Sequence, residues 1–310
     1  MTAIAIHTEN LSRRFGATQA VQGLSLQVPR GVVFGFLGPN GAGKTTTIRL
    51  LLGLLEPTDG KAEVLGFDTV RQADAIRQRT GALLEHNGLY ERLSAEDNLE
   101  FYGRIWHLPA NERRARIREL LTHFGLWERR HENVGKWSRG MKQKLAVARA
   151  LLHRPEMVFL DEPTAGLDPV AAAALRDDLA ALGEREGATV FLTTHNLAEA
   201  EKLCGLVGVI RQGRLLAVGH PDQVRAGAGA LRAEIVGRGF DEQVLAALRA
   251  RPEVAAATVQ NGRLVIELNG EADVAPLVGT VVGAGGQVEE VHKGRASLEE
   301  AFLALMEEER

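Results

Sequence analysis

The sequence predicts an α/β fold with a mostly parallel sheet in its first part and a small α+β domain in its last part. Short apolar runs at residues 32–38, 157–161 and 188–195 are each followed by a helical pattern, and this alternation favours parallel strands with helices packed on them. A glycine-rich segment joins the first run to its helix. The charge balance also changes, from a net +3 over the first 226 residues to −6 beyond them, which indicates a second domain.

The first helix follows from the spacing of its apolar residues. In KTTTIRLLLGLL one face repeats at helical spacing, and it consists of Ile48, Leu51, Leu52 and Leu55. The region 87–152 is expected to be mainly helical and to form a lobe of its own. We therefore expect a first domain over 1–226 with a helical lobe inside it.

The last part of the chain, 227–310, predicts a split βαβ sandwich. The small, flexible residues at 225–233 are typical of a linker. Strands and helices are then expected in the order strand, helix, strand, strand, helix, strand, at 231–236, 241–250, 254–259, 263–268, 273–284 and 287–292. This order suits a split βαβ unit, and a last helix is expected over 298–306.

The composition is that of an ordinary globular protein and narrows the classes of function. The chain has 310 residues, 45% of them hydrophobic and 25% charged, and its net charge of −3 does not indicate nucleic-acid binding. The single cysteine, Cys204, cannot form an internal disulfide and suits a reducing cytoplasm. The N-terminus lacks a signal-peptide pattern, and no run approaches the roughly 20 apolar residues of a membrane-spanning helix. Any membrane role is expected from outside the bilayer.

The segment GPNGAGKT at 38–45 matches the P-loop pattern, with an apolar strand before it and a helix after it. Its glycines let successive N–H groups point at phosphate oxygens, and the helix start adds the positive end of a dipole. Lys44 is expected to reach the β- and γ-phosphates and Thr45 to bind Mg²⁺. The alternative is a glycine-rich turn that binds nothing. The expected binding residues are Gly38, Pro39, Asn40, Gly41, Ala42, Gly43, Lys44, Thr45 and Thr46.

Two adjacent carboxylates, Asp161 and Glu162, end the apolar run 157–161 and should repel each other there. Asp161 is expected to hold Mg²⁺ through water, because Mg²⁺ sheds its waters reluctantly. Glu162 is expected on the opposite face, since neighbours on an extended strand point to opposite sides. There it would polarise the water that attacks the γ-phosphate. The alternative is a pair of acids in a solvated loop.

Four motifs resemble those of ATP-binding-cassette (ABC) transporter ATPase subunits, in the family's order and separations: GPNGAGKTT, WSRGMKQKLAVARAL, FLDEPTAGLDP and FLTTHNLAEAE. The resemblance covers about residues 4–225. It implies a P-loop NTPase fold with a mixed sheet and a helical lobe, with ATP and Mg²⁺ as cofactors. It also implies a head-to-tail dimer with two sandwiched nucleotides and separate transmembrane permease subunits, so that the chain would lie at the cytoplasmic face of the cell membrane.

The motif WSRGMKQKLAVARAL predicts a helix that begins near Gly140, with Ser138 at its N-cap. Helix N-termini attract anions, and the resemblance implies that Ser138 and Gly140 close on the ATP held by the other subunit. Trp137, Arg139 and Met141 depart from the Leu, Gly and Gln that are common in the family. The alternative is a capped basic helix without a phosphate contact.

Three further residues take their expected roles from the resemblance. His195 is similar to the family's switch histidine, which would reach the γ-phosphate, although a lone histidine after a strand is usually structural. Asp168 in AGLDP resembles the loop that communicates between the two nucleotide sites, and the same residues also suit an ordinary turn. Phe15 stands where an aromatic ring usually stacks on adenine, and its alternative is a core phenylalanine.

The largest departure from the family is Glu85 in LLEHNGLYERLS, where a glutamine is usual. That glutamine touches Mg²⁺ and links the ATP state to the membrane partner. A carboxylate can also coordinate Mg²⁺, so Glu85 is expected as a metal ligand, with the adjacent His86 as an alternative. The resemblance puts the groove for the partner's coupling helix in the lobe that follows, residues 87–136.

The function expected from the resemblance is that of the ATP-hydrolysing subunit of an ABC exporter. The acidic C-terminal domain and SLEEAFLAL resemble the tail of the drug, antibiotic-resistance and polysaccharide export branch. A soluble cassette ATPase acting on nucleic acid or ribosomes is one alternative, but the acidic appendage is unsuited to phosphate backbones, and no nucleic-acid partner is expected. A non-hydrolytic regulator is another, and Glu162 and His195 argue against it.

Overall fold

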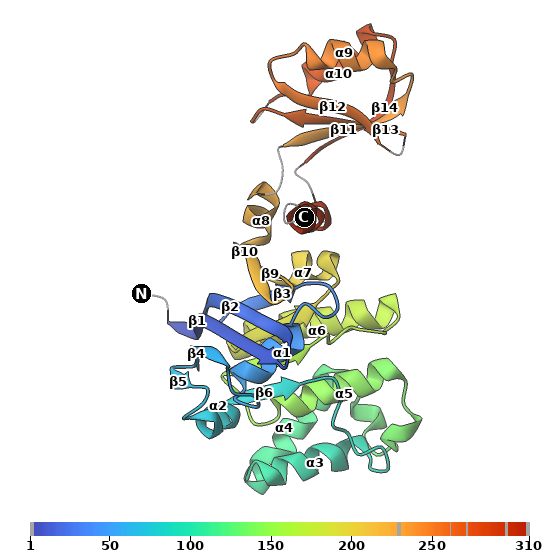
Figure 1. Ribbon diagram of the computed structural model, residues 1–310. Coiled ribbons are helices and arrows are strands. Elements are labelled where there is room, and N and C mark those ends of the chain that lie inside the picture. The colour runs from blue at the N-terminus through green and yellow to red at the C-terminus, as the bar shows by residue number, and fades with distance from the viewer. Residues whose placement is uncertain (1–2, 228–230, 261, 271, 295–296, 308–310) are drawn as a thin grey trace. The chain divides into compact units, whose positions relative to one another are not determined.

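A computed structural model of the chain describes residues 3–227, 231–260, 262–270, 272–294 and 297–307. The chain divides into two compact units, Met1–His220 and Pro221–Arg310. Each unit has its own sheet or sheets (Figure 1). Each also has its own hydrophobic core.

The division lies before the boundary expected at residue 226, because the residues after His220 already form a helix of the second unit. This helix is α8 (Pro221–Gly227), and it packs on α11 (Leu298–Glu307). Residues 228–230 of the expected linker lie outside the described residues.

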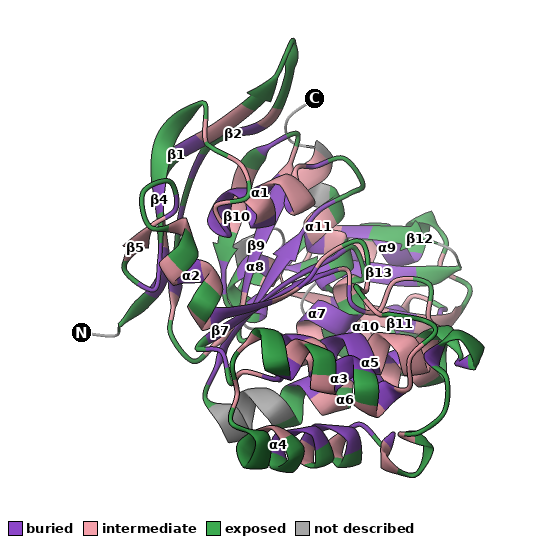
Figure 2. Cartoon of the chain, turned by 90° about the horizontal axis from the view of Figure 1, so that it is seen from below, coloured by how far each residue is buried: buried purple, intermediate pink, exposed green. Residues whose placement is uncertain are grey.

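The first unit is built around a six-stranded sheet in the order β10-β9-β3-β8-β7-β6. Strands β9, β3, β8, β7 and β6 run parallel, and β10 pairs antiparallel with β9 at the edge, which confirms the predicted mostly parallel sheet. Strands β7 and β8 are buried at every position, as the purple colour of β7 shows in Figure 2. The bounds are β3 Val33–Leu37, β6 Thr80–Leu83, β7 Met157–Asp161, β8 Thr189–Thr194, β9 Leu206–Arg211 and β10 Arg214–Gly219.

A second, antiparallel sheet has the order β2-β1-β4-β5, and the sequence patterns did not indicate it. Helix α1 (Lys44–Leu51) contacts β2, β4 and β7, so it lies between the two sheets. A hydrophobic core of the unit includes Leu24 from the second sheet and Phe36 and Phe159 from the first. The strands are β1 Ile4–Phe15, β2 Thr18–Pro29, β4 Asp59–Val64 and β5 Phe67–Asp68.

Helix α1 is shorter than predicted, because it ends at Leu51. Gly53 follows with φ of +63°, and the N–H groups of Leu54 and Leu55 both turn back to the carbonyl of Arg49. A glycine in the left-handed region is a common way for a helix to end. Leu55 therefore lies beyond the helix and is only partly buried.

The chain between β6 and β7 is mainly helical, as predicted for residues 87–152. Helix α5 begins directly after Ser138, which caps it as expected. Among the described residues, no helix has the length and apolar character needed to cross a membrane. The helices of this unit are α2 Ala73–Arg79, α3 Ala95–Ile105, α4 Ala110–His123, α5 Arg139–Leu151, α6 Pro169–Glu186 and α7 Leu197–Leu203, with 3₁₀ turns at Trp127–Arg129 and Val134–Lys136.

The second unit is an antiparallel sheet in the order β12-β13-β11-β14, with helices α9 and α10. Every strand and helix predicted for this part is present, and the strand order is that of a split βαβ unit. Its core includes Leu248, Ile266 and Leu277. The bounds are β11 Arg232–Arg238, α9 Glu242–Arg249, β12 Val254–Gln260, β13 Arg263–Leu268, α10 Ala275–Gly283 and β14 Gln287–Gly294.

Candidate nucleotide site

The glycine-rich loop between β3 and α1 packs so tightly that two of its glycines have no room for a side chain. A Cβ at Gly38 would lie 2.5 Å from the carbonyl oxygen of Ile210, and one at Gly43 would lie 2.3 Å from that of Ala20. Gly43 has a φ of +105° and no side chain with which to cap α1. The backbone N–H groups of the first turn of α1 are therefore available to an anion.

A cavity of about 810 Å³ beside this loop collects residues from distant parts of the sequence. Of the predicted site residues, its lining contains Asn40, Gly41, Ala42, Gly43, Lys44, Thr45, Thr46, Glu85, Asp161, Glu162 and His195. The other predicted residues are described by the structure but lie outside this lining, namely Phe15, Gly38, Pro39, Ser138, Gly140 and Asp168.

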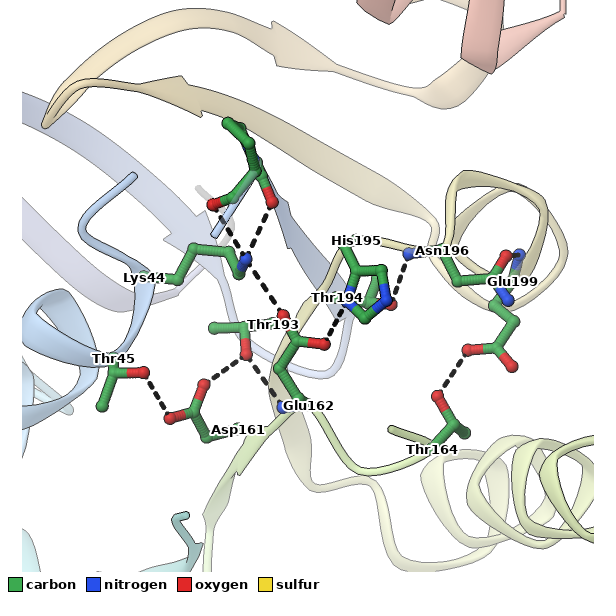
Figure 3. Close-up of polar contacts among 12 residues, drawn as sticks. Lys44, Thr45, Asp161, Glu162, Thr164, Thr193, Thr194, His195, Asn196 and Glu199 are labelled. Atoms are coloured by element: carbon green, nitrogen blue, oxygen red, sulfur yellow. Dashed lines mark hydrogen bonds and ion pairs between the residues drawn. The ribbon is translucent and has the colours of Figure 1, made fainter. Parts of the chain in front are cut away.

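Asp161 ends β7 with both of its carboxylate oxygens hydrogen-bonded (Figure 3). The Thr45 hydroxyl donates to Oδ2 over 2.6 Å, and the Thr193 hydroxyl donates to Oδ1 over 2.5 Å. The carboxylate is buried, with 6% of the residue exposed. A carboxylate beside a hydroxyl offers the oxygen ligands that Mg²⁺ takes in proteins, so these residues fit the metal that the sequence predicted.

Glu162 does not lie on the opposite face from Asp161, and this part of the prediction is wrong. Its φ is +50°, so the extended chain and its alternation end at this residue. Its Oε1 lies 3.0 Å from Nζ of Lys44, and its Oε2 lies 2.5 Å from Nδ1 of His195. The two adjacent carboxylates therefore share one cavity, but each is held by partners of its own.

Lys44 connects the glycine-rich loop to the carboxylate of Glu162. Its ammonium donates to the carbonyl oxygens of Gly38 and Pro39 over 2.7 and 3.3 Å. These two predicted residues thus contribute through their backbone, although they lie outside the cavity lining. The lysine side chain is 6% exposed, so its charge is directed within the site rather than to bulk solvent.

The segment after Glu162 is tied to helix α7, which follows His195. The Thr164 hydroxyl donates to Oε2 of Glu199 over 2.6 Å, and Glu199 is buried. Asn196 caps α7 by accepting from the N–H of Glu199. His195 itself is 57% exposed, so one side of its ring is open to a ligand.

Ser138, Gly140 and Asp168 all lie at helix starts. Ser138 is exposed and accepts a hydrogen bond from the first turn of α5 over 3.3 Å. A Cβ at Gly140 would lie 3.1 Å from the side chain of Ala171. Asp168 Oδ1 accepts from the N–H groups of Val170 and Ala171 at the start of α6. The ordinary turn, which was one of the two interpretations of AGLDP, is therefore present.

Phe15 and Glu85 are both exposed. Phe15 is 44% exposed and has the guanidinium of Arg13 4.6 Å above its ring, so the alternative of a core phenylalanine is wrong. Glu85 lines the cavity, but its carboxylate pairs with Arg49 over 3.1 Å. His86 is described and exposed, and it is not part of the cavity lining.

Three residues whose hydrogen bonds fix the site were not predicted from the sequence, namely Thr193, Thr164 and Glu199. One signal was available in FLTTH, where two hydroxyl side chains end an apolar strand. Hydroxyls buried in a sheet need hydrogen-bond partners, and the adjacent strand end carries the two carboxylates. The lining also contains other residues that were not predicted as site residues, among them Trp137, Lys142 and Gln143.

Comparisons with known proteins agree with this geometry. A family model described as ABC transporter matches residues 21–165. The chain is 40% identical over 313 residues to the daunorubicin resistance ATP-binding protein DrrA3 of Streptomyces coeruleorubidus, covering 100% of this chain and 98% of that protein. It is 42% identical over 211 residues to the bacitracin transport ATP-binding protein BcrA of Bacillus licheniformis, covering 68% of each.

The fold also matches solved structures. The structure of cbiO1 from Clostridium perfringens, described as part of the ABC transporter complex cbiONQ, has a TM-score of 0.67 at 27% identity. The match covers 72% of this chain and 91% of that one. The chain therefore belongs to the ABC transporter family, among its ATP-binding proteins.

Proposed function

We propose that the chain is the ATP-hydrolysing subunit of an ABC exporter and drives transport through separate membrane-spanning subunits. The observation that carries this proposal is the position of Glu162 between Lys44 and His195. Phosphoryl transfer to water needs fixed cations for the phosphate charge and a group that positions the water. Two relatives are named for daunorubicin resistance and bacitracin transport, and these names support the export of drug-like compounds.

Thr45 and Asp161 are the residues proposed to hold Mg²⁺, which when bound neutralises charge on the phosphates. Their oxygens are 2.6 Å apart at the start of α1. Glu85, which also lines the cavity, is proposed as a further ligand. It would have to exchange its partner Arg49 for the metal.

Glu162 is proposed to orient the attacking water and accept its proton. Lys44 and the N–H groups at the start of α1 would bind phosphate oxygens, and His195, paired with Glu162, would contact the γ-phosphate. Negative charge that develops on the phosphate oxygens thus meets donors that are already fixed, which is where most of the catalysis in such a site arises.

A second copy of the chain is proposed to complete each site. Ser138 is exposed and Gly140 half-buried, and neither is part of the cavity lining. Both stand at the N-terminus of α5, which favours contact with anions. These observations support their contact with a nucleotide held by another copy. Asp168 is proposed to belong to the loop that communicates between the two nucleotide sites.

Transmembrane permease subunits are proposed as partners at the cytoplasmic face of the membrane. Two large apolar side chains of α3, Phe101 and Ile105, are four residues apart and 40% and 52% exposed. Residues four apart lie on one face of a helix, and neighbouring exposed apolar side chains often mark a protein contact. They support docking of a permease segment on α3.

The test is ATP-dependent dimerisation measured by light scattering for wild type and Glu162→Gln, each with Mg²⁺ and with EDTA. We expect the variant to lose ATP hydrolysis and to accumulate as an ATP-bound dimer, whereas the wild type returns to monomer as ATP is consumed. Glu156→Gln is the matched control, since Glu156 precedes the other end of β7 and pairs with Arg30. Hydrolysis at the wild-type rate by Glu162→Gln would rule out Glu162 as the base.

A further inference from the structure

Thr193 is fully buried, and its hydroxyl lies between the two residues that the proposed reaction depends on. Its Oγ1 is 2.5 Å from Oδ1 of Asp161 and 2.9 Å from the backbone nitrogen of Glu162 (Figure 3). Strands β7 and β8 are parallel neighbours, and Thr193 stands opposite Asp161 in their register. The pairing of the two strands therefore brings the hydroxyl to this point.

The chemistry of the groups determines the direction of both hydrogen bonds. A carboxylate oxygen accepts, a backbone N–H donates, and a hydroxyl donates its one proton while its oxygen can accept. The Thr193 hydroxyl therefore donates its proton to Asp161 and accepts the N–H of Glu162. One side chain thus orients the proposed metal ligand and the backbone of the proposed base.

Glu162 needs such support, because its φ of +50° is unfavourable for a residue with a Cβ. The carbonyl of Thr193 accepts from the same N–H, over a longer 3.2 Å. This left-handed turn is what brings the Glu162 side chain to Lys44 and His195. Without the hydroxyl, the turn would keep only the longer hydrogen bond.

We propose that Thr193 is a positioning residue for ATP hydrolysis, which holds Asp161 for the metal and Glu162 for the water through one hydroxyl. The proposal rests on the proposed function of the same site. Serine keeps the hydroxyl, so Thr193→Ser is expected to retain the positioning of both residues. Valine has nearly the same shape without the hydroxyl, and it is expected to fail.

The experiment compares Thr193→Val and Thr193→Ser with a control, Thr189→Val, in the full chain. Thr189 stands at the other end of β8, is buried, and accepts a hydrogen bond from the N–H of Gly31 over 2.9 Å. Its replacement removes a comparable buried hydrogen bond away from the cavity. Steady-state kinetics give kcat and KM for ATP. Electron paramagnetic resonance of Mn²⁺ bound to the ATP-loaded chain, in a Glu162→Gln background, reports on the metal site without turnover.

We expect Thr193→Val to lower both kcat and the affinity for Mn²⁺ by about 10- to 100-fold, the usual effect of removing a group that orients a metal ligand. The KM for ATP should change much less, since the P-loop contacts remain. Thr193→Ser should restore both quantities to near wild-type values, and Thr189→Val should affect only thermal stability. Wild-type kcat and Mn²⁺ affinity in Thr193→Val, or equal losses in Thr189→Val, would overturn the proposal.

Two further outcomes are separable. If Thr193→Val does not fold, Thr193→Ala removes the same hydroxyl. Its kcat and its affinity for Mn²⁺ then test the proposal in the same way. ATP hydrolysis by the wild type tests the proposed function, and its absence would defeat that function. The Mn²⁺ comparison needs no turnover and would still test whether Thr193 orients Asp161.

Discussion

Lys44 and Glu162 form an ion pair inside the cavity, with 3.0 Å between Nζ and Oε1. The ammonium also contacts the carbonyl oxygens of Gly38 and Pro39. An ammonium has three donors, so a phosphate oxygen that binds Lys44 must displace one of these partners. Glu162 is the anionic one, and a phosphate therefore competes with it most directly.

Glu162→Gln is expected to tighten ATP binding, because it removes a negative charge beside the proposed position of the γ-phosphate. It also replaces the ion pair with Lys44 by a weaker contact. The Kd should fall about tenfold for ATP and less for ADP, whose phosphates end further from Glu162. Isothermal titration calorimetry with both nucleotides in EDTA measures the difference. Equal ATP affinity in wild type and variant would mean that the carboxylate and the phosphate do not compete.

Gly41→Ala and Gly43→Ala are expected to separate backbone strain from close packing in the P-loop. Both glycines have positive φ, +79° and +105°. A Cβ at Gly41 meets no described atom within 4 Å, whereas one at Gly43 would lie 2.3 Å from the carbonyl of Ala20. Gly41→Ala should lower the free energy of unfolding by about 1–2 kcal/mol, and Gly43→Ala by clearly more. Urea denaturation measures both, and equal losses would contradict the close approach at Gly43.

The hydrogen bond between Thr164 and Glu199 is expected to stabilise the segment that carries the site. Glu199→Ala should cost about 1–3 kcal/mol, because it removes a buried acceptor and leaves the Thr164 hydroxyl unsatisfied. Glu199→Gln keeps an oxygen for that hydroxyl and should cost less. A double-mutant cycle with Thr164→Val, followed by chemical denaturation, measures the coupling between the two side chains. Strictly additive losses would show that they do not interact.

Acid stability is expected to depend on His153, which stacks on Trp106 with ring centroids 3.8 Å apart. Burial lowers the pKa of His153 from 6.5 to about 4. The unfolded chain then binds more protons between these two values, so stability is complete above pH 6.5 and is lost as the pH falls to about 4. Melting temperatures from about pH 8 down to about pH 3 measure this loss, and His153→Phe should remove it between pH 6.5 and about 4.

A second group provides the control for that experiment. The hydrogen bond from Arg113 lowers the pKa of Glu100 from 4.5 to about 2. Its contribution to stability is present above pH 4.5 and is lost only below it, so this loss should persist in His153→Phe. A variant whose melting curve from pH 6.5 to pH 4.5 matched the wild type would show that His153 does not titrate there.

The P-loop, the second unit and the family could be predicted because their signals are local. The motif GPNGAGKT is contiguous, and the elements of the second unit follow clear periodicities between turn residues. The sheet formed by β1 and β2 escaped prediction, because several register shifts interrupt the pairing of these long strands. A register shift breaks the two-residue alternation by which a half-buried strand is recognised.

At the site, the order of residues along the chain was enough to put Asp161 and Glu162 at one strand end and Lys44 and Thr45 at one helix start. The direction in which Glu162 turns was not available from that order. It depends on the hydroxyl and carbonyl of Thr193, which is 31 residues further along the chain. Alternation predicts the face of a side chain only while the strand stays extended, and hydrogen bonds from the neighbouring strand end that regularity at Glu162.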